Sequence, residues 1–203
     1  MKVLSKHIEN AVEQLSSLPS VGKRTALRLA LHLLKKDEDE IRRFAQSFIQ
    51  MKENILFCKC CGNISDQVIC EICSNPARNH DEICIVEDIR DIMAIEETGS
   101  FKGIYHVLGG VISPMDGIGP NDLNIHSLIE KLHQGNVKEI IFALNATMEG
   151  DTTSFYLYKK IAVFDVFISA LSRGVSVGTE LQYADELTLG SSIINRTPFK
   201  LTV

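Results

Sequence analysis

The sequence predicts an α/β protein of several modules: a helical N-terminal part, a small cysteine-rich segment, and a parallel-sheet domain with a short C-terminal tail. Three observations predict this organisation. Apolar residues recur with helical spacing over residues 4–34, four cysteines stand in two pairs between residues 58 and 73, and strand-like apolar runs alternate with helical patterns from residue 82 onward. Strands separated by helices of about ten or more residues imply a mostly parallel sheet with helices on both faces.

The composition excludes several classes of protein. Of the 203 residues, 45% are hydrophobic and 23% are charged, which is typical of a globular chain and not of a disordered one. Arg28 and His32 interrupt the longest apolar run, so we expect no membrane-spanning segment. Residues 1–20 lack the pattern of a secretory signal, which predicts a cytoplasmic protein. The absence of tryptophan and the low aromatic content argue against a carbohydrate cleft or a base-stacking platform.

The net charge of −5 is divided unevenly along the chain. Residues 1–36 contain seven Lys and Arg side chains and two acids, a net charge of +5, whereas the remainder contains 14 basic and 24 acidic residues, a net charge of −10. This division predicts an N-terminal end that faces a polyanion and an acidic body that meets a basic partner. A short basic segment also arises by chance, and the sequence leaves that alternative open.

Two helices are expected at residues 4–18 and 23–34, joined by the short turn Leu-Pro-Ser-Val-Gly. Such a turn presents free backbone N–H groups at the start of the second helix, where they suit a phosphate oxygen. The motif resembles a helix-hairpin-helix, which binds the DNA backbone without reading sequence and whose turn usually reads Leu-Pro-Gly-Val-Gly; Ser20 replaces the first glycine here. The candidate DNA contacts are Gly22, Lys23, Arg24 and Arg28. The alternative is an ordinary helical hairpin with a solvated basic face.

Six cysteines in a chain expected to be cytoplasmic indicate thiols or metal ligands and not disulfides. Two Cys-x2-Cys pairs are separated by eight residues, and each pair can aim two sulfurs at one point, with a positive φ expected at Gly62. Four thiolates fill a tetrahedral site, so we expect one structural Zn2+ per chain, with chance spacing or a redox pair as the alternative. The expected ligands are Cys58, Cys61, Cys70 and Cys73. Cys60 is expected to be a bystander and Cys84 a core residue.

From residue 82 onward, strand and helix patterns alternate. Residues 109–122 are rich in Gly, Pro and Asp and are expected to form a loop at the end of the second strand. Strands are expected at 82–88, 103–109, 137–145 and 175–177, and helices at 88–101, 123–135 and 153–174.

Polar residues gather where two of these strands end. Glu87 and Asp88 close the first strand, and Asn-Ala-Thr-Met-Glu-Gly-Asp, residues 145–151, follows the third. The arrangement resembles a Toprim domain, whose active members hold Mg2+ with a glutamate after the first strand and an Asp-x-Asp after the third. In type IA topoisomerases the second motif reads Asp-Pro-Asp-Arg-Glu-Gly-Glu. Asn145 and Thr147 replace both aspartates here, so the resemblance implies a Toprim fold without the usual metal catalysis.

The acids that remain at this edge are candidate contacts for a basic partner, and the alternative is a solvated acidic face. These acids are Glu87, Asp88, Glu149 and Asp151. No side chain stands out as a catalytic residue. Tyr156 and Tyr158 fall on a predicted helix, and His106 and His126 lack an evident catalytic partner, so we expect all four to be structural.

The order of these modules, with the strings YHVLGGVISPMDGIGP and RGVSVGTELQYADELTL, resembles the RecR family of bacterial recombination mediators over essentially the full chain. The resemblance implies a helix-hairpin-helix region at 1–53, a zinc finger at 54–77, a Toprim domain at 80–175 and an oligomerisation tail at 176–203. It also implies recombinational DNA repair with RecO and RecF, and loading of recombinase on gapped DNA. Binding to single- and double-stranded DNA without sequence preference and a ring-shaped homotetramer are further implications.

Two other functions remain possible from the sequence. One is a magnesium-dependent Toprim nuclease or strand-cleaving enzyme that uses the four acids in displaced roles. The other is a zinc-stapled scaffold that binds protein and has no direct role on DNA. Cleavage of labelled DNA with magnesium and binding to gapped DNA distinguish the three.

Overall fold

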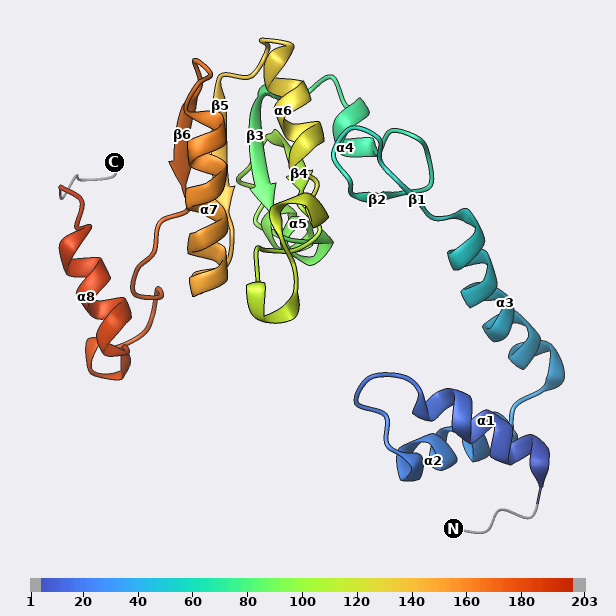
Figure 1. Cartoon of the computed structure of the whole chain (residues 1–203). Helices are drawn as coiled ribbons and strands as arrows, with labels where there is room; N and C mark the ends of the chain where they lie inside the picture. The colour runs from blue at the N-terminus through green and yellow to red at the C-terminus, as the bar shows by residue number, and fades with distance from the viewer. Residues whose placement is uncertain (1–4, 199–203) are drawn as a thin grey trace. The chain divides into compact units, whose positions relative to one another are not determined.

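The computed structural model describes residues 5–198, which divide between Ile55 and Leu56 into two compact units. Each unit is described by itself (Figure 1). In the described part of the chain, no helix combines the length and the apolar character needed to cross a bilayer.

The first unit consists of helices α1 (Lys6–Ser16), α2 (Lys23–Leu33) and α3 (Glu38–Asn54). Helices α1 and α2 pack against each other as a hairpin, and the two predicted helices are therefore confirmed. Ala26 and Ala30 are buried on one face of α2, where their small side chains allow close helix packing. The opposite face of α2 is left to solvent.

The second unit begins with the cysteine-rich segment. Strand β1 (Leu56–Phe57) pairs with β2 (Ile64–Ser65) in antiparallel fashion, and the short helix α4 (Glu71–Ser74) follows. A segment this small cannot bury an apolar core of its own. Its buried residues are the four paired cysteines.

A four-stranded parallel sheet forms the rest of the second unit, in the order β4-β3-β5-β6. Alternate residues of β3 point to opposite faces. Ile83 and Ile85 belong to a core under α6 and α7, and Cys84 belongs to a second core under α5, as predicted for this cysteine. A parallel sheet with helices on both faces is confirmed. The strands are β3 (Asn79–Val86), β4 (Gly103–Val107), β5 (Glu139–Ala143) and β6 (Phe167–Ala170), and the helices are α5 (Ile89–Glu97), α6 (Ile125–His133) and α7 (Met148–Ile161).

The prediction of one long helix over 153–174 is wrong. Helix α7 ends at Ile161 and the chain returns as strand β6, while residues 175–177 form no strand. The apolar run here fits a period of two as well as a helical period, and its β-branched and aromatic residues favour a strand. Ile168 pairs with Ile140 of β5 and packs against the core, so sheet pairing decides between the two patterns.

Residues 109–122 form a loop at the carboxyl end of β4, as predicted, with two short 3-10 turns at Pro114–Asp116 and Pro120–Asp122. The loop is fixed to α7 because Ile112 N donates a hydrogen bond of 2.8 Å to the buried Thr153 hydroxyl. The C-terminal tail contains helix α8 (Glu186–Ile194). The Asp185 side chain caps the N-terminus of this helix, and none of the helix residues is buried. The last residues of the predicted tail, 199–203, lie outside the described residues.

Candidate nucleic-acid interface and metal centre

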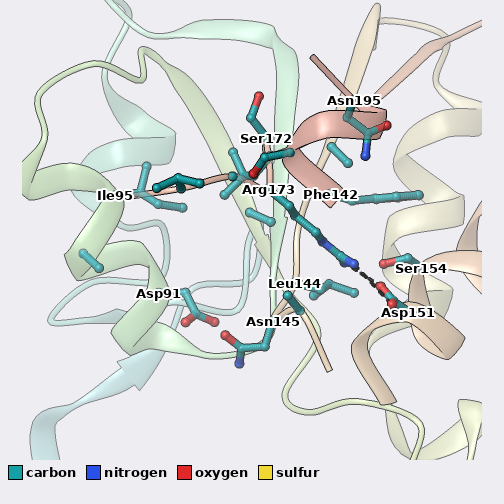
Figure 2. Close-up of a pocket in the computed structure, with 18 of the residues that line it drawn as sticks. Asp91, Ile95, Phe142, Leu144, Asn145, Asp151, Ser154, Ser172, Arg173 and Asn195 are labelled. Carbon is teal, nitrogen blue, oxygen red and sulfur yellow. Dashed lines mark hydrogen bonds and ion pairs between the residues drawn. The ribbon is translucent and has the colours of Figure 1, made fainter. Parts of the chain in front are cut away.

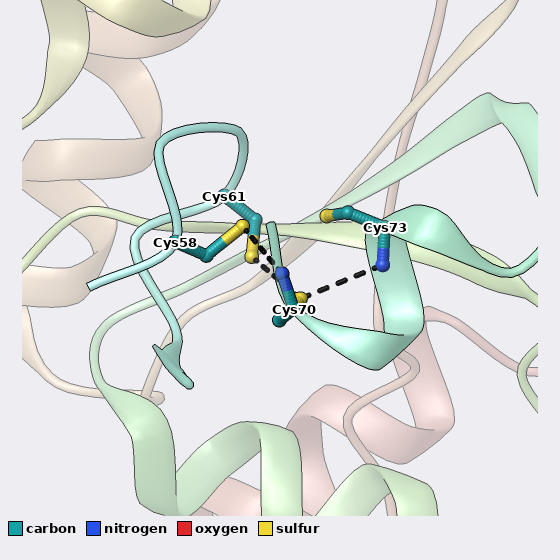
Figure 3. A group of neighbouring side chains, drawn as sticks. All are labelled: Cys58, Cys61, Cys70 and Cys73. Atoms are coloured by element: carbon teal, nitrogen blue, oxygen red, sulfur yellow. Dashed lines mark hydrogen bonds between the residues drawn. The ribbon is translucent and has the colours of Figure 1, made fainter. Parts of the chain in front are cut away.

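The four paired cysteines meet at one point (Figure 3). Their sulfur atoms all lie within 4.8 Å of one another, and all four residues are buried. Cys61 Sγ and Cys70 Sγ are 3.6 Å apart, close to the ~3.8 Å expected for two sulfurs bound to one tetrahedral zinc at about 2.3 Å each. Backbone N–H groups point at the sulfurs, for example Cys70 N at 3.2 Å from Cys58 Sγ, and stabilise thiolates. Gly62 has the expected positive φ, +80°.

This donor set fits a structural zinc ion. Four buried thiolates complete the tetrahedral coordination and leave no position for a substrate. The first cysteine pair is also tied to the sheet, because Val107 N of β4 donates to the carbonyl of Cys61 at 2.8 Å. Zinc bound here therefore fixes a segment that adjoins the sheet core.

His106 of β4 is completely buried and has a structural role, as predicted. Its Nε2 lies 2.6 Å from the carbonyl of Asn124 and its Nδ1 lies 3.1 Å from Lys131 Nζ. Burial and the neighbouring Lys131 ammonium lower the pKa of His106 to about 4, so the ring is neutral at neutral pH. A neutral ring donates from Nε2 to Asn124 and accepts from Lys131 at Nδ1, which leaves neither nitrogen for catalysis.

Glu87 and Asn145 lie side by side at the carboxyl ends of β3 and β5, as the parallel topology requires. Asn145 Nδ2 donates a hydrogen bond of 2.8 Å to Glu87 Oε2. Thr147 is the N-cap residue of α7, and its hydroxyl accepts from Gly150 N at 3.1 Å. Gly150 is needed here, because a Cβ at this position would lie 2.0 Å from the Asn145 carbonyl oxygen. The motif between residues 145 and 151 therefore caps a helix and binds a carboxylate by hydrogen bonding.

The four predicted partner-binding acids lie at the same edge of the sheet in different surroundings. Asp88 caps α5 and pairs with Arg90, whose guanidinium lowers the pKa of the Asp88 carboxyl. Asp151 is paired with Arg173 at 2.5 Å, and this guanidinium likewise lowers the pKa of Asp151. Within residues 5–198, Glu149 forms no ion pair and is exposed.

A cavity of about 960 Å³ opens at the carboxyl ends of β5 and β6 (Figure 2). The Asp151–Arg173 pair crosses one side of it, and Asp91 and Asn145 lie at another. The sequence did not single out Arg173 or Asp91. Asp91 accepts hydrogen bonds from the Glu87 and Asp88 backbone, and the spacing of Asp88 and Asp91, typical of a capping box, is the signal that identifies it. Arg173 has no local signal, since its partner is 22 residues away.

The hairpin between α1 and α2 places its candidate residues at the start of α2. Ser20 has a φ of +64°, the left-handed conformation that glycine adopts more easily, so the turn keeps its shape in spite of the substitution. Gly22 has an ordinary φ of −76°, and a Cβ there would meet no heavy atom of the described chain within 4 Å. The first N–H groups of α2 have no partner in the helix and receive no side-chain cap. Lys23 and Arg24 are exposed beside them, and Arg28 is exposed one helical turn after Arg24.

Four family models match successive parts of the chain. They describe the RecR helix-hairpin-helix (residues 8–52), the RecR zinc finger domain with four cysteines (55–75), the Toprim domain (81–172) and the RecR C-terminal region (174–197). The fold and the metal centre thus define a zinc-containing Toprim protein with an N-terminal helix-hairpin-helix.

Curated relatives match over nearly the full length. Recombination protein RecR of Flavobacterium johnsoniae is 60% identical over 100% of this chain and 98% of the relative. The proteins of the same name from Parabacteroides distasonis and Porphyromonas gingivalis are 56% and 50% identical, over 96% and 100% of this chain and 94% and 98% of the relatives. The chain belongs to the RecR family of recombination proteins.

Replacing Thr147 by Ala is expected to lower the free energy of unfolding by about 1 kcal/mol, because the N-terminal N–H groups of α7 lose their capping hydroxyl. Urea denaturation measures this change. Thr152→Ala is the matched control on the same helix, since the Thr152 hydroxyl bonds only back to the Met148 carbonyl, and we expect a change below about 0.5 kcal/mol. Equal destabilisation by the two substitutions would show that the cap contributes nothing.

Proposed function

We propose that the chain is a non-enzymatic, DNA-binding recombination mediator in recombinational DNA repair, which acts with RecO and RecF to load recombinase on gapped DNA. Its membership of the RecR family supports the role in recombination. The single observation that carries the DNA-binding part is Gly22. Gly22 is the N-cap residue of α2 and has no side chain, so the first N–H groups of the helix stay open to an approaching anion.

A phosphate group suits that position. The uncapped N–H groups at the start of α2 and the positive end of its dipole attract an anion, and Lys23 and Arg24 add two full charges. Such groups contact the DNA backbone and not the base edges, so binding is independent of sequence. A factor that acts at gaps in arbitrary sequences needs this kind of contact.

The carboxyl edge of the sheet supports a function without Toprim metal catalysis. Active Toprim sites bring several carboxylates to one divalent cation, whereas here the amide of Asn145 donates directly to Glu87. A hydrogen-bonded amide adds no negative charge, and the hydroxyl of Thr147 is used as a helix cap. The same edge retains acids for a basic partner such as RecO, with Glu87, Asp88, Glu149 and Asp151 as the proposed contacts.

Assembly into an oligomer raises the affinity for DNA, because several weak contacts act together. A ring-shaped tetramer formed through tail residues 176–203 presents four hairpins to one DNA molecule, and the high effective concentration of the hairpins then raises the overall affinity although each contact stays modest. Leu187 and Ile194 of α8 are 86% and 77% exposed, which supports a role of this tail in covering, or being covered by, another copy.

Mass measurement in solution, with and without gapped DNA, tests the proposal. We expect a tetramer that binds gapped, single-stranded and duplex DNA with little sequence preference. Failure to bind gapped DNA at low salt would favour the scaffold that binds protein alone.

We expect no magnesium-dependent cleavage of labelled DNA by the purified protein, because the two aspartates of the metal site are replaced by Asn145 and Thr147. The assay compares the parent chain with Glu87→Gln. Cleavage by the parent that disappears in Glu87→Gln would establish the nuclease instead.

A further inference from the structure

One face of α2 and the turn after it carries a row of exposed side chains. Arg24, Arg28, Leu31 and Lys35 follow each other at intervals of four, three and four residues, so they lie above one another on the same face. We call these four residues the α2 ridge. The ridge lies opposite Ala26 and Ala30, the residues that pack inside the hairpin, and lines a shallow groove of about 410 Å³.

Within residues 5–198, the charges of the α2 ridge have no ion-pair partner. Among residues 5–198, no carboxylate lies within ion-pair distance of Arg24, Arg28 or Lys35. The adjacent residue Lys36 differs, because its ammonium pairs with Glu40 at 2.5 Å. Two neighbouring lysines of the turn between α2 and α3 thus differ: Lys36 is paired with a carboxylate of α3, whereas Lys35 forms no ion pair within residues 5–198.

The length of the α2 ridge indicates which kind of ligand it fits. Lys35 is eleven positions after Arg24, and at 1.5 Å per position the two lie ~16 Å apart along the axis. Leu31, which is 41% exposed, stands between Arg28 and Lys35. The cations therefore cannot converge on one small anion. They match a linear polyanion, and duplex DNA carries one charge per about 1.7 Å of its axis.

We propose that the DNA-binding surface continues from the hairpin along the α2 ridge, and that Lys35 contacts a phosphate different from the one held at Gly22. This inference rests on the proposed DNA-binding role of the hairpin. Lys35 then adds affinity and salt dependence without adding sequence preference, because an ammonium reads phosphate charge and not base edges.

The test compares Lys35→Gln with Lys36→Gln in the full-length protein. Fluorescence anisotropy with a labelled duplex and a gapped duplex gives the dissociation constant at several salt concentrations. For Lys35→Gln we expect a slope of log affinity against log salt that is smaller by about 0.9, and an affinity lower by roughly five- to tenfold at 0.1 M salt. For Lys36→Gln we expect parental slopes and affinity, since that charge is already paired.

Identical slopes for the two variants would overturn the inference. If Lys23→Glu/Arg24→Glu loses DNA binding in the same experiment, the hairpin function stands and only the extension to Lys35 fails. Parental binding by all three variants would refute both proposals. A poly-glutamate peptide is the second probe: if Lys35→Gln weakens its binding and leaves DNA binding unchanged, the α2 ridge binds an acidic protein and the inference is wrong.

Discussion

Charge reversal at Lys23 and Arg24 is expected to lower the affinity for DNA by roughly 50-fold or more at 0.1 M salt, by a similar factor for every sequence. Each lost phosphate contact reduces the salt slope on duplex DNA by about 0.9, so the double variant should lose about 1.8. Both side chains are exposed and neither forms an ion pair within residues 5–198. The helical content and the zinc content should therefore remain parental.

The matched control is Arg43→Glu/Lys52→Glu, which makes the same change in net charge on α3 of the same unit. We expect a much smaller effect on DNA binding, since a change in overall charge acts at long range and is screened by salt. Equal losses in the two double variants would indicate a general electrostatic effect. Parental binding by Lys23→Glu/Arg24→Glu across the salt series would show that the hairpin is not the contact.

Loss of the metal is expected to have the largest effect on folding. Purified protein should contain one zinc per chain, and Cys70→Ser should lose the ion and unfold the segment from Leu56 to Ser74, whose buried residues are the cysteines themselves. Structural zinc contributes roughly 10–16 kcal/mol of apparent binding free energy in comparable small domains, far more than four buried thiols supply by packing. Metal analysis and thermal unfolding measure the two effects.

Cys60→Ser is the control for the metal experiment, because Cys60 lies within the first pair, between Cys58 and Cys61, and is not one of the four clustered sulfurs. We expect it to keep stoichiometric zinc and nearly parental stability. Stoichiometric zinc in a Cys58→Ala/Cys73→Ala double variant would contradict the assignment of the ligands.

Most of the fold was predictable from local patterns in the sequence. Helical spacing predicted α1 and α2, and the alternation of apolar runs predicted the parallel sheet, because these signals depend on side chains close together in the chain. The prediction of a helix over residues 153–174 failed because the apolar residues of this run fit both a helical period and a period of two. Only the pairing of β6 with β5, a contact between distant segments, excludes the helix.

The candidate site was likewise predicted where its signal is local and missed where it depends on contacts between distant segments. The spacing of the cysteines was sufficient to predict the cluster, since two short knuckles define it. The bond from Asn145 to Glu87 spans 58 residues, and the sequence predicted only that the two strand ends would be neighbours. The space around Gly22, where a Cβ would meet no heavy atom of the described chain within 4 Å, depends on the packing of the hairpin, which no sequence pattern records.

The close approach at Gly150 has a consequence for how such motifs are interpreted. Any side chain at position 150 would overlap the Asn145 carbonyl oxygen, and only the hydrogen atom of glycine fits there. This steric requirement does not depend on the chemistry of the neighbouring side chains. The need for glycine at position 150 therefore comes from the strand-to-helix turn and is independent of whether aspartates stand at positions 145 and 147. A glycine at this place in a new sequence is evidence for the shape of the turn, and only the aspartates before it are evidence for a catalyst.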